Sequence, residues 1–208
     1  MHAPYRSATF RLMFPGAHIE THGDKPALIM ADSGYTLTFR ELDAAANRLS
    51  RVLRAAGTWF SILDSDDVLS IIKDCGARAY ITSMYKADLG AELLDSTPDV
   101  ELRLMLDGTS DGYDSFEASV DAQSSEPLGE ERIAGIDMLY SSGTTGMPKG
   151  VALPFPNLPL AEAAGGVSPM LQMLFGADDT TRYLSPAPFY HAAPLRFCVA
   201  MHMIGATV

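Results

Sequence analysis

Patterns typical of helices and of strands alternate through the middle of the chain, and this alternation limits the fold more than any other feature. Segment 65–74 begins with hydroxyl and acidic residues, which favour the start of a helix. A buried strand at 77–83, a helix at 85–96 and an alternating strand at 100–106 follow. Strands that alternate with helices are typical of layered α/β folds with parallel pairing. We therefore expect an α/β fold with layered, parallel-rich sheets and flanking helices.

The segment before this region predicts a β-hairpin followed by a helix. Two β-rich runs, 27–30 and 34–38, flank a turn at 31–34 that ends in glycine. Thr38 and Glu41 then have the T-x-x-E spacing of a capping box. The helix that this motif opens has one apolar face, and Gly57 is expected to end it. The residues of that face are Leu42, Ala45, Leu49, Val52 and Leu53.

The segment after the alternating region is less regular. Residues 108–132 are rich in Asp, Ser and Glu, and we expect a surface excursion with one short helix. Two strands are then expected, at 136–140 and at 151–154, on either side of a polar loop. Asn157 is in a position to cap a helix that follows.

Composition excludes several classes of protein. The 208 residues carry a formal net charge of −11, which argues against general binding to nucleic acid or to anionic lipid. Three prolines, two histidines and an arginine interrupt the most apolar stretch, 186–208, so we expect no membrane span. The two cysteines, Cys75 and Cys198, are too few for a disulfide framework and fit buried thiols in a reducing compartment. We expect a cytoplasmic protein.

The polar loop within Tyr140–Val151, YSSGTTGMPKGV, has the composition of an anion-binding site. Its glycines let the backbone approach a ligand closely, and successive N–H groups in such a loop surround an anion. The hydroxyl groups and Lys149 add donors suited to phosphate oxygens. The loop is not a Walker A motif, because Lys149 follows Gly146 by three residues and precedes Gly150 rather than a hydroxyl residue. Composition alone leaves a flexible surface loop as the alternative.

The same loop resembles the signature phosphate loop of the AMP-forming acyl-adenylate synthetases, a superfamily that includes acyl-CoA ligases, luciferases and the adenylation domains of peptide synthetases. The G-T-T-G core and the P-K-G that follows it coincide with that signature. Segments 23–57, 66–83 and 183–195 resemble other parts of the same family. The last of these, YLSPAPFYHAAPL, is most similar to fatty-acyl-CoA ligases.

The resemblance implies a reaction in two steps. A carboxylic acid, expected to be a fatty acid, attacks ATP to give acyl-AMP and pyrophosphate, and the thiol of coenzyme A then takes the acyl group. It implies catalytic roles for Lys149 and for His191, which matches the motif histidine beside the carboxylate and acyl pocket. The residues implied to bind the phosphates are Ser141, Ser142, Gly143, Thr144, Thr145, Gly146 and Lys149. We find no spacing typical of metal ligands, and we expect no chemical role for the other histidines.

Three features depart from the family pattern. About 30 residues, the length of a βαβ crossover, are expected to be missing after Gly57. Phe155 stands where many members of the family have a histidine. The chain ends at Val208, in a segment that is expected to begin a core strand, whereas members of the family continue with the adenine-, ribose- and magnesium-binding residues.

The end of the sequence shapes what we expect of the protein as a whole. Residues 1–208 are expected to be a partial N-terminal AMP-binding domain without the C-terminal domain. The ligands of the Mg²⁺ that accompanies ATP are then expected outside this fragment. We expect the chain alone to be an incomplete and inactive piece of the enzyme. The alternative is a non-catalytic nucleotide-binding remnant or an interaction module.

Overall fold

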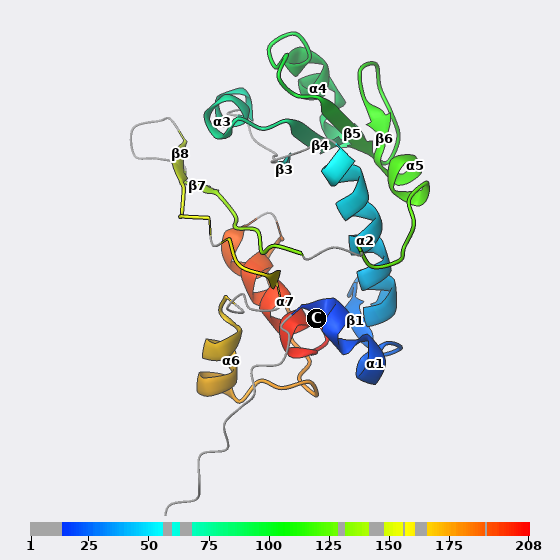
Figure 1. Cartoon of the computed structure of the whole chain (residues 1–208), viewed down its shortest axis with the longest axis vertical. Coiled ribbons are helices and arrows are strands. Elements are labelled where there is room, and N and C mark those ends of the chain that lie inside the picture. The colour runs from blue at the N-terminus through cyan, green and yellow to red at the C-terminus, as the bar shows by residue number, and fades with distance from the viewer. Residues whose placement is uncertain are drawn as a thin grey trace, which may run out of the picture. The chain divides into compact units, whose positions relative to one another are not determined.

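The computed structural model divides into two compact units, which are described separately (Figure 1). The first unit comprises residues 1–42, 130–135 and 156–208, and the second comprises residues 43–129 and 136–155. The structure describes residues 14–55, 60–62, 68–128, 132–141, 148–155, 157–160, 166–189 and 191–208.

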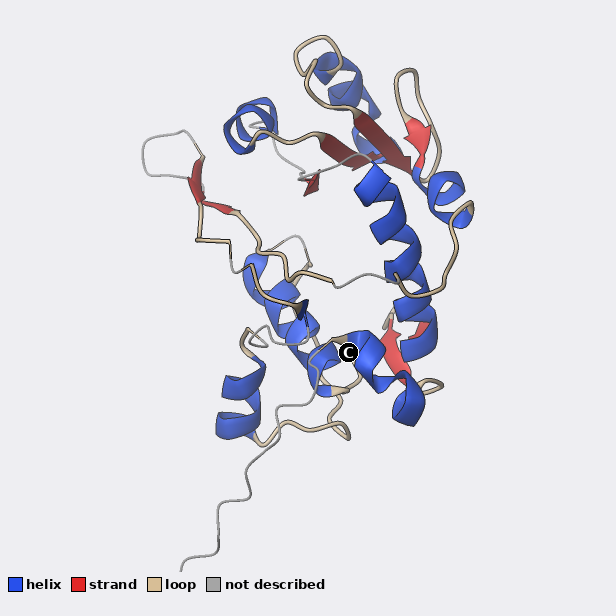
Figure 2. Cartoon of the chain, viewed as in Figure 1, coloured by secondary structure: helices blue, strands red, loops and turns tan. Residues whose placement is uncertain are grey.

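A parallel sheet of four strands forms the centre of the second unit (Figure 2). The strands lie in the order β3-β4-β5-β6 and all pair in parallel. Their bounds are Phe60–Ile62, Ala79–Ser83, Leu102–Leu106 and Asp114–Ser115. The sheet confirms the predicted α/β fold. Strand β6 and the short helix α5 (Phe116–Asp121) both lie in the segment expected to be a surface excursion. Composition predicted that helix, but two residues of strand are too short to be recognised by periodicity.

Successive residues of the central strands pack into two different apolar clusters, because side chains alternate between the faces of a sheet. Tyr80 and Met105 pack with residues of α3 (Val68–Cys75) and α4 (Ala87–Leu93). Their neighbours Ile81 and Leu104 pack instead with Val52 and with Phe116 of α5. Helices therefore cover both faces of the sheet, as expected for parallel strands whose residues are buried throughout.

The first unit contains a small antiparallel sheet and several helices. Strands β1 (Pro26–Ile29) and β2 (Thr36–Thr38) form the predicted hairpin. The end of the chain pairs with β1, because Val208 N–H donates to Ala27 O at 2.9 Å and Ile29 N–H donates to Val208 O at 2.8 Å. The helices are η1 (Pro15–His18), α1 (Ile19–His22), α6 (Ser168–Phe175) and α7 (Ala192–Ile204). Leu171, Ala200, Met201 and Ile204 join α6 and α7 in one apolar cluster.

Helix α2 (Phe39–Ala55) contributes residues to both units and begins where the capping box predicts. Glu41 N–H donates to Thr38 Oγ1 at 3.2 Å, and Thr38 N–H donates to Glu41 Oε2 at 2.8 Å. This reciprocal pair satisfies two of the amide donors that a helix start leaves without partners. Gly57, the expected end of the helix, lies outside the residues that the structure describes.

Other predictions need correction or lie outside the described ranges. The helix that Asn157 was expected to cap cannot be followed, because residues 161–165 lie outside the described residues; α6 begins at Ser168, eleven residues after Asn157. The strand predicted at 151–154 is β8, Lys149–Val151, so it begins two residues earlier than expected. The start of α3 at 65–67 is not described, and α3 is seen from Val68. No described helix is long and apolar enough to span a bilayer.

Candidate functional site

A short antiparallel hairpin carries the candidate phosphate loop. Strand β7 (Leu139–Ser141) leads into the loop and β8 (Lys149–Val151) leaves it (Figure 1). The paired residues are Leu139 with Val151, Tyr140 with Gly150, and Ser141 with Lys149. Ser142, Gly143, Thr144, Thr145 and Gly146 lie outside the described residues. The structure thus brings together the two ends of the predicted loop, Ser141 and Lys149.

Lys149 is the candidate cation of the site. It belongs to strand β8 rather than to the loop, because its backbone pairs with that of Ser141. Lys149 is exposed to solvent, so its ammonium group is available to an anion. Sequence spacing placed Lys149 in a glycine-rich loop because Gly150 follows it. Gly150 is nevertheless a strand residue.

Gly150 is needed in the hairpin because the Tyr140 ring lies against it. A Cβ atom at position 150 would clash with Met138 Cε and would also meet Tyr140 Cζ at 2.9 Å and Cε1 at 3.0 Å, which is too close for ordinary packing. The hydroxyl group of Tyr140 donates a hydrogen bond of 2.6 Å to Asp74 Oδ2, near the end of α3. Burial and this bond to a carboxylate raise the pKa of Tyr140, so the hydroxyl group stays protonated and remains a donor.

His191, the second candidate catalytic residue, lies in the first unit at the N-cap position of α7. Its backbone is extended, its N–H donates to Pro188 O at 3.2 Å, and its carbonyl accepts from Leu195 N–H at 3.2 Å. The residue is exposed and stands at the positive end of a 13-residue helix. Phe189 is exposed as well, and Tyr190 lies outside the described residues.

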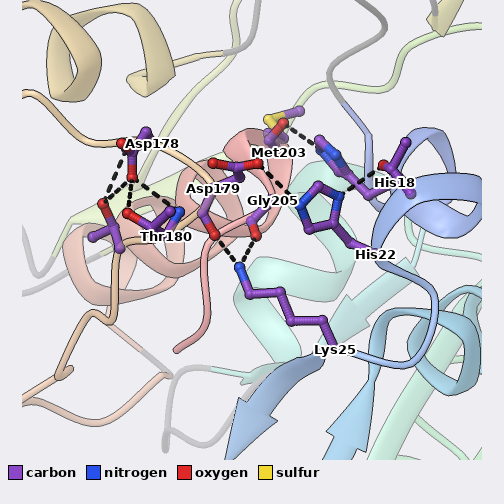
Figure 3. A network of polar contacts seen from close by, with 10 residues as sticks. His18, His22, Lys25, Asp178, Asp179, Thr180, Met203 and Gly205 are labelled. Atoms are coloured by element: carbon purple, nitrogen blue, oxygen red, sulfur yellow. Dashed lines mark hydrogen bonds and ion pairs between the residues drawn. The ribbon is translucent and has the colours of Figure 1, made fainter.

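A polar network in the first unit was not predicted from the sequence (Figure 3). Lys25 Nζ donates to Gly205 O at 2.6 Å and also to Asp179 O. His22 Nε2 lies 2.9 Å from Asp179 Oδ2, and His18 Nε2 lies 2.9 Å from Met203 O. Burial lowers the pKa of Lys25, while Asp179 and Asp178 oppose that change. Most of these bonds end on backbone carbonyls, so the network holds segments together rather than presenting free groups to a ligand.

These contacts join residues more than 150 positions apart in sequence. No local spacing could have revealed them, and neither His18 nor His22 had a recognisable partner in the sequence. A local sequence signal exists around Asp178, where the Thr180 N–H donates to Asp178 Oδ1 at 2.9 Å, as Figure 3 shows.

Within the described ranges, no group of three or more His, Cys, Asp or Glu residues could hold a metal ion. Of the two free cysteines, Cys198 is buried and Cys75 is half-buried. Burial raises the pKa of both thiols, which disfavours the reactive thiolate.

Two curated bacterial proteins are similar to this chain in sequence. Tyrocidine synthase 2 of Brevibacillus parabrevis is 30% identical over 175 residues, which cover 75% of this chain and 5% of that protein. Surfactin synthase subunit 2 of Bacillus subtilis (strain 168) is 30% identical over 149 residues, which cover 60% of this chain and 4% of that protein. The chain thus spans a small fraction of the curated relatives it matches.

Several solved structures share the fold. The anthranilate CoA ligase AuaEII in complex with anthranoyl-AMP matches with a TM-score of 0.69 and 21% identity over 93% of this chain and 43% of that one. ATP-bound MatB from Rhodopseudomonas palustris matches with a TM-score of 0.66 and 18% identity over 95% of this chain and 44% of that one. A long-chain-fatty-acid-CoA ligase from Archaeoglobus fulgidus matches with a TM-score of 0.69 and 19% identity over 93% and 45%.

The comparisons agree with the resemblance carried by the loop and its flanking motifs. The family model of the AMP-binding enzymes matches residues 58–208, well over half of the 208-residue chain. That range includes the parallel sheet, the hairpin β7–β8 and His191. The chain belongs to the AMP-binding enzyme family of adenylate-forming ligases.

Proposed function

We propose that this chain provides the phosphate-binding part of an enzyme that activates a carboxylic acid with ATP. The observation that carries the proposal is the hairpin β7–β8, which places Lys149 opposite Ser141 at the ends of the candidate phosphate loop. A carboxylate oxygen attacks the α-phosphorus of ATP, and the bond from that phosphorus to the β-phosphate breaks. The products are acyl-AMP and pyrophosphate, and the pyrophosphate takes the electron pair of the broken bond.

The hairpin and its loop act by stabilising the leaving pyrophosphate. Negative charge grows on the β-phosphate as the bond breaks, and a fixed cation and donors nearby lower the barrier. Lys149 supplies the cation, and its exposed position leaves it accessible to a phosphate. The hydroxyl and amide donors are assigned to Ser141, Ser142, Gly143, Thr144, Thr145 and Gly146.

His191 is assigned to the carboxylic acid. It is exposed at the start of α7, where the aligned peptide dipoles favour negative charge. Holding the carboxylate in a fixed orientation removes part of the entropic barrier to its attack. No protein nucleophile takes part in this step, which fits the raised pKa values of Cys75 and Cys198.

The second step and the acid are also part of the proposal. The thiol of coenzyme A attacks the acyl carbon of acyl-AMP, forms a thioester and releases AMP. A fatty acid is proposed from the segment 183–195 and is supported by the likeness to a long-chain-fatty-acid-CoA ligase. Magnesium supplies charge neutralisation on ATP when it is bound, and its ligands are expected outside the described residues. We propose a cytoplasmic location, where ATP and coenzyme A are available.

A second candidate substrate has its own support. The two curated relatives are a surfactin synthase subunit and a tyrocidine synthase, each 30% identical to this chain, and the superfamily that the loop resembles includes adenylation domains of peptide synthetases. Their similarity favours an amino acid as the carboxylic acid that is activated. The first step is the same for both candidates, and they differ in the acid and in the thiol that accepts the acyl group.

The test begins with the anion site itself. We expect the unmodified chain to bind pyrophosphate in isothermal titration calorimetry, and Lys149→Ala to weaken that binding about tenfold, because one charge-assisted contact is lost. Lys73→Ala is the matched control, since Lys73 is an exposed lysine on α3. Equal affinities in the Lys149→Ala variant and the unmodified chain would remove Lys149 from the site.

The reaction class is tested by the product of ATP. For a full-length enzyme that contains this part, we expect acid-dependent exchange of pyrophosphate into ATP, with fatty, aromatic and amino acids compared side by side. Release of ADP and phosphate would overturn the assignment. Binding of pyrophosphate without any exchange would favour the non-catalytic nucleotide-binding remnant.

A further inference from the structure

We propose that Tyr140 and Asp74 are a positioning pair, which fixes the hairpin β7–β8 to helix α3 and thereby sets the position of Lys149. The inference rests on the proposed function, because it assigns to Lys149 a phosphate to bind. It adds two residues that contact neither ATP nor the acid in the proposed reaction. Both residues belong to the second unit.

The hairpin needs an anchor because it is very short. Each of its strands has three residues, and a two-stranded ribbon of this length is marginally stable in water. Among the strands that the structure describes, it forms a sheet of its own and is not paired with the four parallel strands of the second unit. Contacts to other elements must therefore hold it, and α3 is such an element because it lies against β8.

Helix α3 is a firm support. Its residues Val68 and Ile72 are buried in the apolar cluster that includes Tyr80 and Met105 of the central strands. Asp74 lies in the last turn of the same helix, so its carboxylate is attached to the core of the unit. The Tyr140 hydroxyl group donates to that carboxylate at 2.6 Å. Hydrogen bonds to a charged acceptor are about twice as strong as neutral ones.

The Tyr140 ring connects this bond to Lys149. Tyr140 pairs with Gly150 across the hairpin, and the absence of a Cβ atom at position 150 lets the ring lie against the backbone there. The neighbouring pair in the ladder is Ser141 with Lys149. A shift of the ring therefore moves the strand immediately beside Lys149, at the exit of the candidate phosphate loop.

The first experiment measures the anchor alone. Tyr140→Phe removes the hydroxyl donor, and Asp74→Asn replaces the charged acceptor with a weaker neutral amide; both changes keep the shape of the side chain. We expect amide hydrogen exchange of residues 139–141 and 149–151 to rise about fivefold in both variants, with exchange in the central strands unchanged. Tyr85→Phe is the matched control, because Tyr85 is 87% exposed. Unchanged exchange in the hairpin of both variants would overturn the anchor.

The second experiment asks whether the pair acts through Lys149. We expect Tyr140→Phe to weaken pyrophosphate binding about threefold to tenfold, and to have no further effect in a Lys149→Ala background. We expect the double variant Tyr140→Phe/Asp74→Asn to bind as weakly as either single variant. Equal additional losses with and without Lys149 would overturn the positioning role, since a general structural effect would not depend on that lysine.

The two experiments separate this inference from the proposed function. If the unmodified chain bound no pyrophosphate, the proposed function and the positioning role would both be wrong, while hydrogen exchange would still decide whether Tyr140 anchors the hairpin. If pyrophosphate bound normally to Tyr140→Phe although the hairpin exchanged faster, the proposed function would stand and the positioning role would be wrong.

Discussion

Different kinds of contact stabilise each of the two units internally. In the second unit, apolar side chains from the parallel strands and their helices form two clusters over the sheet. In the first unit, polar side chains also bond backbone carbonyls that are distant in sequence. Lys25 bonds the carbonyl of Gly205, His202 that of Ala27, and Thr207 that of Pro26. Apolar contacts have no preferred direction, whereas a hydrogen bond depends on the angle between its donor and acceptor as well as on their distance.

This difference determines which contacts can be predicted from local patterns in the sequence. The buried strands and helices of the second unit follow one another within about 50 residues, and each has its own periodic pattern. The polar contacts of the first unit join residues at positions 18–27 to residues at positions 179–207. A single sequence has no local feature that reports such pairs.

The largest effect is predicted for the loss of a buried apolar side chain in the second unit. Met105 is completely buried in the cluster between the sheet and its helices. We expect Met105→Ala to lower the free energy of unfolding of the second unit by about 2–5 kcal/mol, through lost apolar burial and the cavity that remains. Urea denaturation and amide exchange in β4 and β5 measure the loss.

Met173→Ala is the matched control for this change. Met173 lies on α6 in the first unit and is 78% exposed, so its truncation leaves no cavity. We expect a change within about 0.5 kcal/mol. A similar loss in both variants would show that burial of Met105 does not stabilise the second unit in the way described.

The fold could be predicted where local chemistry determines it. The capping box at Thr38 and Glu41 gave the start of α2, and the apolar runs gave the parallel strands. Strand β6 was missed because two residues have no period to recognise. Strand β8 was misplaced because Gly150, which favours a loop, lies in the strand, where the side chains of Met138 and Tyr140 leave no room for a Cβ atom.

The candidate site could be predicted only in part. The motif brought Ser141 and Lys149 to attention, and the hairpin places them opposite each other. The bond from Tyr140 to Asp74 spans 66 positions and has no local signal in the sequence. The roles of Lys149 and His191 stay predictions, as do those of the loop residues 142–146.

A smaller effect is predicted for the loss of the hydrogen bonds that Lys25 makes in the first unit. Lys25→Met keeps the apolar stem and removes the ammonium group, which leaves the carbonyls of Asp179 and Gly205 without this donor. We expect the free energy of unfolding of the first unit to fall by about 1–2 kcal/mol, less than for the apolar truncation. Amide exchange at residues 205–208 and in β1 measures it.

Lys73→Met separates the network from the general loss of a positive charge. Lys73 is an exposed lysine in the second unit, and its substitution should leave exchange in the first unit unchanged. Two results would contradict the role assigned to the network: faster amide exchange in β1 after Lys73→Met, or unchanged amide exchange in β1 after Lys25→Met. In the first case net charge would be the cause, and in the second the carbonyls would find other partners.

The smallest predicted effect at neutral pH concerns His202 of the first unit. We expect protonation of His202 to make the first unit, and not the second, less stable in acid. His202 Nε2 lies 2.9 Å from Ala27 O, which requires the nitrogen to be the donor, and the ring packs edge-on against Phe39. Burial lowers the pKa of His202, and the bond to Ala27 opposes that change only in part. Between the folded pKa and the unfolded value of about 6.5, the unfolded chain binds more protons, so stability rises with pH.

This contribution is therefore complete above about pH 6.5 and is lost as the pH falls through the folded pKa of His202. His202→Gln keeps an amide donor for Ala27 and removes the titrating ring, so we expect its stability to fall less steeply between pH 7.5 and pH 5. Amide exchange in β1 measures that slope, and β4 in the second unit is the internal reference. Equal slopes in the variant and the unmodified chain would mean that protonation of His202 is no harder in the folded state. The first unit would then differ from the second in the geometry of its contacts but not in its sensitivity to acid at this residue.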